Sequence, residues 1–235
     1  MTKPDYMSLQ PVIILGMHRS GTSCLAGSLE QAGLSLGDVN RKAPHNAKGN
    51  RENFDIMALH DALLAANGGS WDDPPWSVKW SPEQKLQRDH LNDTYPAYSD
   101  WGFKDPRTLL TLSGWLDALP NARLVGTFRH PLAVARSLQA RNQFPLEAGL
   151  DLWMSNNRML LQYHLDRGVD LICFDWPPER YTRGLKAIAA KLGLTVPRDG
   201  FSFYEPGLRK NDVTGEADLP VPVAEVYHSL LECVS

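Results

Sequence analysis

The 235-residue chain has few cysteines, little net charge and no long apolar run. Its three cysteines stand at unrelated spacings, which excludes both a cysteine metal cluster and a disulfide framework. A net charge of −3, with the two signs interspersed, leaves no basic face suited to duplex nucleic acid. The apolar runs fall far short of the ~20 residues that span a bilayer. We therefore expect neither a nucleic-acid partner nor a membrane partner.

The first residues of the chain are not expected to form a signal peptide. The first ten residues, MTKPDYMSLQ, contain no continuous apolar stretch of the kind found in signal peptides. Together with the cysteine usage, this favours a reducing, cytoplasmic location. Cys24 and Cys173 lie in apolar contexts, so we expect both in the core. The length suffices for a sizeable core, and one domain over residues 1–235 is the simplest expectation.

The most informative feature is the segment VIILGMHRSGTSCLAGSL, residues 12–29. Four apolar residues predict a buried strand, and an amphipathic helix follows Gly21. Between them, Gly16 and Gly21 have the G-x-x-x-x-G spacing of a phosphate-binding loop, in which backbone N–H groups and the helix dipole face an anion. Thr22 stands where a nucleotide triphosphatase has its lysine, and the cation comes earlier, at Arg19. The loop suits phosphate but departs from the ATP-binding pattern.

Strand and helix patterns alternate along the chain. The predicted strands are Val12–Leu15, Trp101–Lys104, Arg123–Phe128 and Val169–Phe174. The predicted helices are Thr22–Ala32, Phe54–Ala66, Arg107–Leu119, Pro131–Arg141, Leu146–His164, Pro178–Leu192 and Val221–Cys233. This alternation predicts an α/β fold: a single P-loop-type domain whose central parallel sheet of about four to five strands is flanked by helices on both faces.

A long insertion, residues 35–100, separates the first helix from the second strand. Apart from the helix expected over Phe54–Ala66, it is polar and irregular, and long irregular segments of this kind often serve function. Trp71, Trp76 and Trp80 lie within it, beside two adjacent prolines. We expect the insertion to form an acceptor pocket or lid, although packing of the insertion on the sheet explains one or two of the tryptophans equally well.

Two further clusters of polar residues follow predicted strands. Lys104 and Asp105 end the second strand, and Arg129 ends the third, with Ser137 and Arg141 on the following helix. Ligands of parallel sheets collect at the carboxyl ends of strands, so these residues are expected on the same edge as the glycine-rich loop. The alternative for Lys104 and Asp105 is a plain surface ion pair. Two anion pockets on one edge suit a nucleotide phosphorylated at both ends.

The three motifs GMHRSGTS, FKDPR and RHPLAVARSLQAR together resemble the sulfotransferase superfamily, in the branch of bacterial and tyrosylprotein sulfotransferases. The resemblance extends over roughly residues 12–194. It implies transfer of a sulfuryl group from 3′-phosphoadenylyl sulfate (PAPS) to a hydroxyl or amine, leaving adenosine 3′,5′-bisphosphate (PAP), without a metal. The implied acceptor is a small molecule, a sugar or a peptide.

The resemblance also implies roles for individual residues. Lys104 would contact the sulfuryl oxygens and the leaving bridge oxygen, and Arg19 would neutralise the transferring group. The 3′-phosphate would lie against Arg129 and Ser137, with Arg141 as a further cation. The 5′-phosphosulfate would be bound by the loop residues His18, Arg19, Ser20, Gly21, Thr22 and Ser23.

The resemblance also implies a general base and a loop that closes over the cofactor. The stretch KGNRENFD resembles a G-x-x-E element of bacterial members, which nominates Glu52 as the base. His18, His60 and Asp105 are the alternatives. A basic stretch, LRKN, resembles a loop that covers the nucleotide, so residues 199–220, with Arg209 and Lys210, are expected to close over the cofactor. Phe174 would lead to the adenine region.

Two other classes of function remain open from the residues alone. The apolar run Leu171–Phe174 followed by Asp175 imitates a magnesium-supporting strand, as in a P-loop kinase or nucleotide triphosphatase. A non-catalytic nucleotide-binding module is the second alternative. Thr22 at the lysine position disfavours the first, and Lys104 with a candidate base disfavours the second. The acceptor and the oligomeric state are not determined by the sequence.

Overall fold

The computed structural model describes residues 10–44, 46–95, 100–211, 213 and 218–234. Its centre is a parallel sheet of β1 (Val12–Leu15), β2 (Gly102–Lys104), β3 (Arg123–Phe128) and β4 (Asp170–Cys173), in the order β2-β1-β3-β4. Val12 pairs with Gly102 on one side and with Arg123 on the other. Because β1 is a central strand, all four of its residues are buried, as the continuous apolar run predicts.

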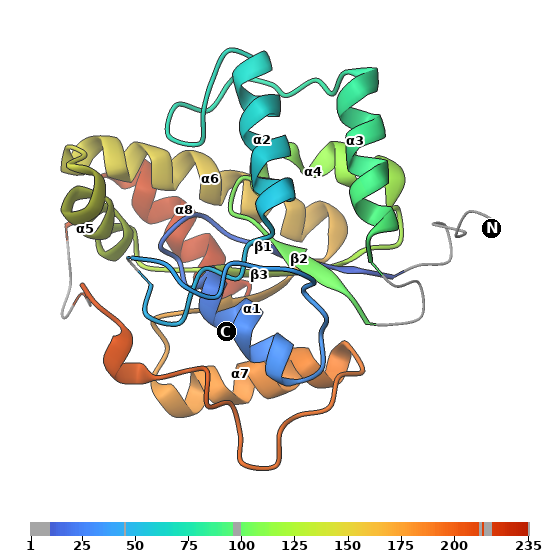
Figure 1. The fold of residues 1–235 in the computed structure, drawn as a ribbon. Helices are drawn as coiled ribbons and strands as arrows, with labels where there is room; N and C mark the ends of the chain where they lie inside the picture. The colour runs from blue at the N-terminus through green and yellow to red at the C-terminus, as the bar shows by residue number, and fades with distance from the viewer. Residues whose placement is uncertain (1–9, 45, 96–99, 212, 214–217, 235) are drawn as a thin grey trace.

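Helices cover both faces of the sheet (Figure 1). On one face lie α1 (Thr22–Gln31) and α7 (Pro178–Lys191). The other face carries α4 (Thr108–Ala118), α6 (Leu146–Arg167) and α8 (Val221–Glu232), and α5 (Pro131–Asn142) packs against α6. The prediction of an α/β fold with a helix-covered parallel sheet is confirmed, with four strands in the described residues.

The alternation of side chains along β1 divides the core between these two layers. Ile13 and Leu15 join the cluster that contains Trp115 and Trp153, whereas Val12 and Ile14 join the cluster formed with α1 and α7. Every predicted helix is present, and its ends differ from the prediction by no more than a few residues.

The insertion contains α2 (Phe54–Ala66), as predicted, and a second helix, α3 (Pro82–Asp93), which was not predicted. The start of α3 has a capping box between Ser81 and Gln84, with proline at the first helical position. Arg88 of α3 donates to the carbonyl oxygen of Gly114 in α4, which ties the insertion to the rest of the fold. Among the described residues, no helix is long and apolar enough to cross a membrane.

Candidate active site

The loop between β1 and α1, residues 16–21, has a backbone that glycine alone fits at Gly21. Gly21 has a left-handed φ of 87°, and a Cβ there would lie 2.4 Å from the Phe174 ring. The first α-helical hydrogen bond runs from Leu25 N to Gly21 O (3.0 Å), so the N–H groups of the three residues before Leu25 have no acceptor within the helix. Those residues, Thr22, Ser23 and Cys24, line a cavity of about 620 Å³. The cavity therefore meets the positive end of α1.

Five of the six loop residues predicted to bind the 5′-phosphosulfate line this cavity, and one does not. His18, Arg19, Gly21, Thr22 and Ser23 line it. Ser20 is not among the lining residues; its hydroxyl is fully buried, and its carbonyl accepts a hydrogen bond from Thr127. Cys24, which was expected in the core, is partly buried against the core cluster of α1 and α7 and also lines the cavity; burial raises the pKa of its thiol to about 11. Cys173 is buried, as predicted.

A cluster of arginines borders the loop. Arg19 adopts a left-handed φ of 68° and donates from Nε to Ser137 Oγ at 2.8 Å. Burial lowers the pKa of Arg19, and the charges of Arg141 and Arg129 lower it further. All four residues line the cavity, so the structure brings together the residues predicted for an anion pocket. Like charges held this close indicate a site for an anion.

Arg129 is fixed by two further contacts. Its Nε donates to Asp175 Oδ1 at 3.0 Å, and a terminal nitrogen donates to the carbonyl oxygen of Lys210 at 2.5 Å. Arg209 donates to the carbonyl oxygens of Phe174 and Trp176, at 3.3 and 3.1 Å. The C-terminal segment that was predicted to close over a cofactor thus lies against the arginine cluster, within its described residues.

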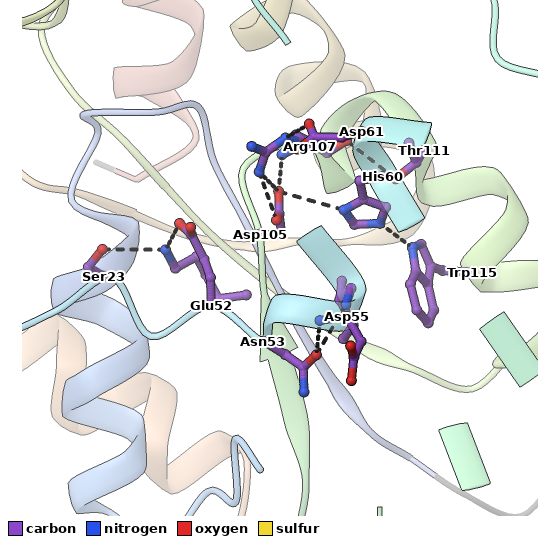
Figure 2. A network of polar contacts seen from close by, with 12 residues as sticks. Ser23, Glu52, Asn53, Asp55, His60, Asp61, Asp105, Arg107, Thr111 and Trp115 are labelled. Carbon is purple, nitrogen blue, oxygen red and sulfur yellow. Dashed lines mark hydrogen bonds and ion pairs between the residues drawn. The ribbon is translucent and has the colours of Figure 1, made fainter. Parts of the chain in front are cut away.

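Lys104 and Glu52 form an ion pair at the wall of the same cavity. Lys104 Nζ lies 2.5 Å from Glu52 Oε1 and 3.3 Å from Ser23 Oγ (Figure 2). The side chain of Lys104 is completely buried, and that of Glu52 is 8 % exposed. Glu52 lines the cavity, whereas Lys104 is not among the lining residues. The lysine of the second motif and the candidate base of the insertion therefore meet directly.

His60 and Asp105, two of the alternative bases, lie in a separate buried network (Figure 2). Trp115 donates to His60 Nε2 at 2.8 Å, and His60 Nδ1 lies 3.6 Å from Asp105. Arg107 binds both Asp105 oxygens, at 3.0 and 3.1 Å, and pairs with Asp61 at 2.6 Å. Neither His60 nor Asp105 lines the cavity, while Arg107 does. This network orients Arg107.

His18, the remaining alternative base, lines the cavity in a neutral form. Its ring centroid lies 4.4 Å from that of Trp71. Burial lowers its pKa to about 3, and the nearby charges of Arg107 and Lys104 act in the same direction. A group with so low a pKa is a weak base near neutral pH, so the geometry and charge favour Glu52 over His18.

A further contact at the cavity was not predicted. Lys48, from the insertion, donates to the carbonyl oxygens of Ser202 and Phe203, both at 2.8 Å, and pairs with Glu205 at 2.5 Å. Lys48, Phe203 and Glu205 all line the cavity. We call the Lys48–Glu205 pair the clasp, because it joins the insertion to the C-terminal segment. No sequence pattern links these distant segments.

The protein thus has an α/β architecture, with a cavity at the carboxyl ends of the strands that is lined by a loop–helix junction and by arginines. A profile of the sulfotransferase family matches residues 11–166. The chain therefore belongs to the sulfotransferase family, and it is a transferase enzyme. A comparison with curated protein sequences gave no match.

Three solved structures share the fold. The sulfotransferase domain of the olefin synthase from Synechococcus PCC 7002 is 18% identical, with a TM-score of 0.61 and 97% of each chain covered. The sulfotransferase domain from the curacin biosynthetic pathway is 16% identical, with a TM-score of 0.52 and coverage of 93% of this chain and 83% of that one. Sulfotransferase STF1 from Mycobacterium tuberculosis H37Rv is 15% identical, with a TM-score of 0.52 and coverage of 95% and 76%.

Proposed function

We propose that this sulfotransferase moves the sulfuryl group of PAPS onto a hydroxyl group of a small-molecule acceptor. The observation that carries the proposal is the presence of two sets of anion-binding groups on one cavity. The first set consists of the first-turn N–H groups of α1, with Lys104 buried next to them against Ser23 rather than on the cavity wall. The second consists of Arg129, Arg141 and Ser137. PAPS carries anionic groups on both the 5′ and the 3′ oxygens, so its charge distribution fits both sets.

The donor would be bound by residues from several elements. The β1–α1 loop and Arg19 would bind the 5′-phosphosulfate, and Arg129, Ser137 and Arg141 the 3′-phosphate. Phe174, which packs on Gly21 and lines the cavity, would border the adenine. Residues 199–220, which include Arg209 and Lys210, would then close over the nucleotide. Positive charge at fixed positions is the main contribution that a protein makes to such a transfer.

The chemistry is an in-line displacement at sulfur. The acceptor oxygen forms a bond to sulfur while the bond between sulfur and the bridging oxygen of the 5′-phosphate breaks, and that oxygen keeps the electron pair. The acceptor proton passes to the Glu52 carboxylate. The positive charge of Lys104 stabilises the negative charge that develops on the bridging oxygen. The 2.5 Å contact between Lys104 and Glu52 supports these two roles, because both groups act on the same small volume.

Two observations argue against a kinase. Thr22 occupies the lysine position of the phosphate loop, and the Asp175 carboxylate already accepts bonds from Arg129 Nε and from His130 N at 2.6 Å. An aspartate engaged in this way is not directed at a magnesium ion in the cavity. A non-catalytic nucleotide-binding module would not require the candidate base Glu52 to line the cavity beside Lys104.

The proposal includes a single catalytic domain over residues 1–235. The insertion supplies Glu52, Met57 and Trp71 to the cavity wall, which supports a role in acceptor binding.

Calorimetric titration tests the proposal directly. PAP should bind in the absence of magnesium, and more tightly than ATP. Adenosine 5′-phosphosulfate, which lacks the 3′-phosphate, is the matched ligand, and it should bind more weakly than PAPS. Transfer of sulfur-35 from labelled PAPS to an acceptor then confirms the reaction. If only Mg·ATP binds, the chain is a kinase or nucleotide triphosphatase and the proposal fails.

A further inference from the structure

We propose that Trp71 forms the acceptor-binding surface of this enzyme and selects neutral, planar aromatic alcohols. The inference rests on the proposed function, since it assigns the acceptor class of the same site. The three tryptophans of the insertion have different environments. Trp76 is fully exposed, and Trp80 packs edge-on against Trp115, with ring centroids 6.0 Å apart. Trp71 alone among these three lines the cavity.

The indole of Trp71 is held in place by its neighbours. It stacks on Phe144 at a centroid distance of 6.0 Å and an interplanar angle of 12°, and it contacts His18. The loop that carries it is closed by Asn67, whose side chain donates to Lys79 O at 3.0 Å and accepts from Lys79 N at 2.9 Å. A flat ring fixed before binding loses little conformational entropy when a planar ligand packs on it.

Trp71 lies on the side of the cavity where the chemistry is proposed. Its contact residue His18 is close enough to Arg107, Asp105 and Lys104 for their charges to act on its titration, with a smaller effect from Arg141. Met57 and Pro106, which follow Glu52 and Lys104 along the chain, add apolar lining. An acceptor whose hydroxyl reaches Glu52 would therefore place its carbon skeleton among these groups. Planar aromatic carbon suits such a surface.

The charges near this surface favour a neutral acceptor. Lys48, elsewhere on the cavity wall, has three N–H donors, and all three are engaged by two carbonyl oxygens and Glu205. The guanidinium of Arg107 is balanced by Asp61 and Asp105. Neither cation can take up a carboxylate or sulfate of an acceptor without breaking these contacts. His18, Met57 and Pro106 also offer few hydrogen bonds to the many hydroxyls of a sugar, and buried hydroxyls without partners are unfavourable.

The test compares three neutral alcohols: 2-naphthol, its saturated analogue decahydro-2-naphthol, and methyl β-D-glucopyranoside. Binding to the PAP-loaded enzyme is measured by calorimetry, and transfer by kcat/KM with sulfur-35 PAPS. We expect 2-naphthol to be preferred over the saturated analogue by roughly ten-fold, in line with ring stacking. Trp71→Ala should raise the KM for 2-naphthol roughly ten-fold and change that for decahydro-2-naphthol much less.

Two variants control for folding. Trp76→Ala alters an exposed tryptophan of the same segment and should leave both kinetic constants unchanged. Trp71→Phe keeps a planar ring and should retain most of the preference, which covers the case in which Trp71→Ala does not fold. PAP affinity should stay the same in all three variants.

The outcomes separate the acceptor assignment from the proposed function. If PAP binds and the saturated alcohol or the glucoside is used as well as 2-naphthol, the assignment of Trp71 is wrong and the sulfotransferase function stands. The same holds if Trp71→Ala folds and keeps the preference, or if PAP binds and none of the three alcohols binds or reacts. If neither PAP binding nor sulfuryl transfer is seen, the proposed function itself fails.

Discussion

Lys104 and Glu52, 52 positions apart in the chain, meet through a 2.5 Å contact between Nζ and Oε1. The ammonium group is completely buried, so the carboxylate supplies charge compensation that water does not. Ser23 Oγ is a second partner, at 3.3 Å, and joins the pair to the first turn of α1. The first motif, the second motif and the insertion thus meet in one local cluster of polar side chains.

Removing only one member of this pair should destabilise the fold. Lys104→Met leaves the Glu52 carboxylate without its partner, and we expect a loss of about 3 kcal/mol in the free energy of unfolding. The double variant Lys104→Met with Glu52→Gln should recover most of that loss. Urea unfolding of both variants and of Glu52→Gln completes a double-mutant cycle. Additive effects of the two substitutions would contradict a direct ion pair.

Glu52→Gln should mainly affect turnover. The amide keeps the shape of the side chain but cannot accept the acceptor proton, so we expect kcat to fall about 10²–10⁴-fold. PAP affinity should change little, because the acceptor proton is not involved in binding the product nucleotide. The acidic limb of the pH–rate profile should disappear as well. Full turnover across the pH range would show that Glu52 is structural, and His18 would become the next base to test.

Arg129→Ala should weaken nucleotide binding. A charge-assisted hydrogen bond from a nearly buried arginine is worth about 1.5–3 kcal/mol, so we expect the Kd for PAP to rise at least ten-fold. Turnover at saturating PAPS should fall much less, since the 3′-phosphate lies away from the reacting bond. Arg136→Ala, an exposed arginine on the same α5 helix, is the control. An unchanged Kd for PAP in Arg129→Ala would remove Arg129 from the donor site.

The clasp should retard release of the nucleotide. Lys48→Met breaks the contacts to Glu205 and to two carbonyl oxygens, and leaves the packing of Arg51 on the Phe203 ring as the remaining contact of this kind between the insertion and the C-terminal segment, within the described residues. Since Glu205 is 56% exposed, we expect a change of only about 1 kcal/mol, seen as roughly five-fold faster dissociation of PAP in stopped-flow measurements. Lys42→Met, an exposed lysine of the same segment, serves as the control. Equal dissociation rates in the two variants would exclude a closing role.

The sequence was sufficient for the parts of the structure that depend on local pattern. The apolar run of β1, the glycine spacing and the helix periodicities each express a local preference, and the fold and the cavity-lining loop residues follow from them. The signal for α3 was also local, since Ser81, Pro82 and Gln84 form a capping box with proline at the first helical position. The low apolar content of that helix concealed it.

Contacts between distant segments could not be predicted in the same way. The alternative prediction, that Lys104 and Asp105 form an ion pair on the surface, is wrong because both side chains are buried. Successive residues at the end of a strand point to opposite faces, so Lys104 reaches Ser23 and Glu52 while Asp105 reaches His60 and Arg107. The clasp likewise depends on how two loops meet, which no spacing encodes.

The last prediction concerns how His18 lowers the stability of the folded protein at acidic pH. Its pKa is lowered to about 3 in the folded protein, mainly by burial, whereas an unfolded histidine titrates near 6.5. Between these values the unfolded chain binds a proton that the folded chain does not, so stability falls as the pH decreases from about 6.5 toward 3. The contribution is at most about 1.4 kcal/mol per pH unit.

His18→Gln should therefore lose stability less steeply than wild type in urea unfolding between pH 6.5 and 4. His90→Gln, at an exposed position of α3, should follow wild type. Bound PAP should reduce the difference between wild type and His18→Gln, because an anion beside the imidazole favours its protonated form. Parallel pH curves for wild type and His18→Gln would show that His18 is protonated as readily in the folded cavity as in the unfolded chain.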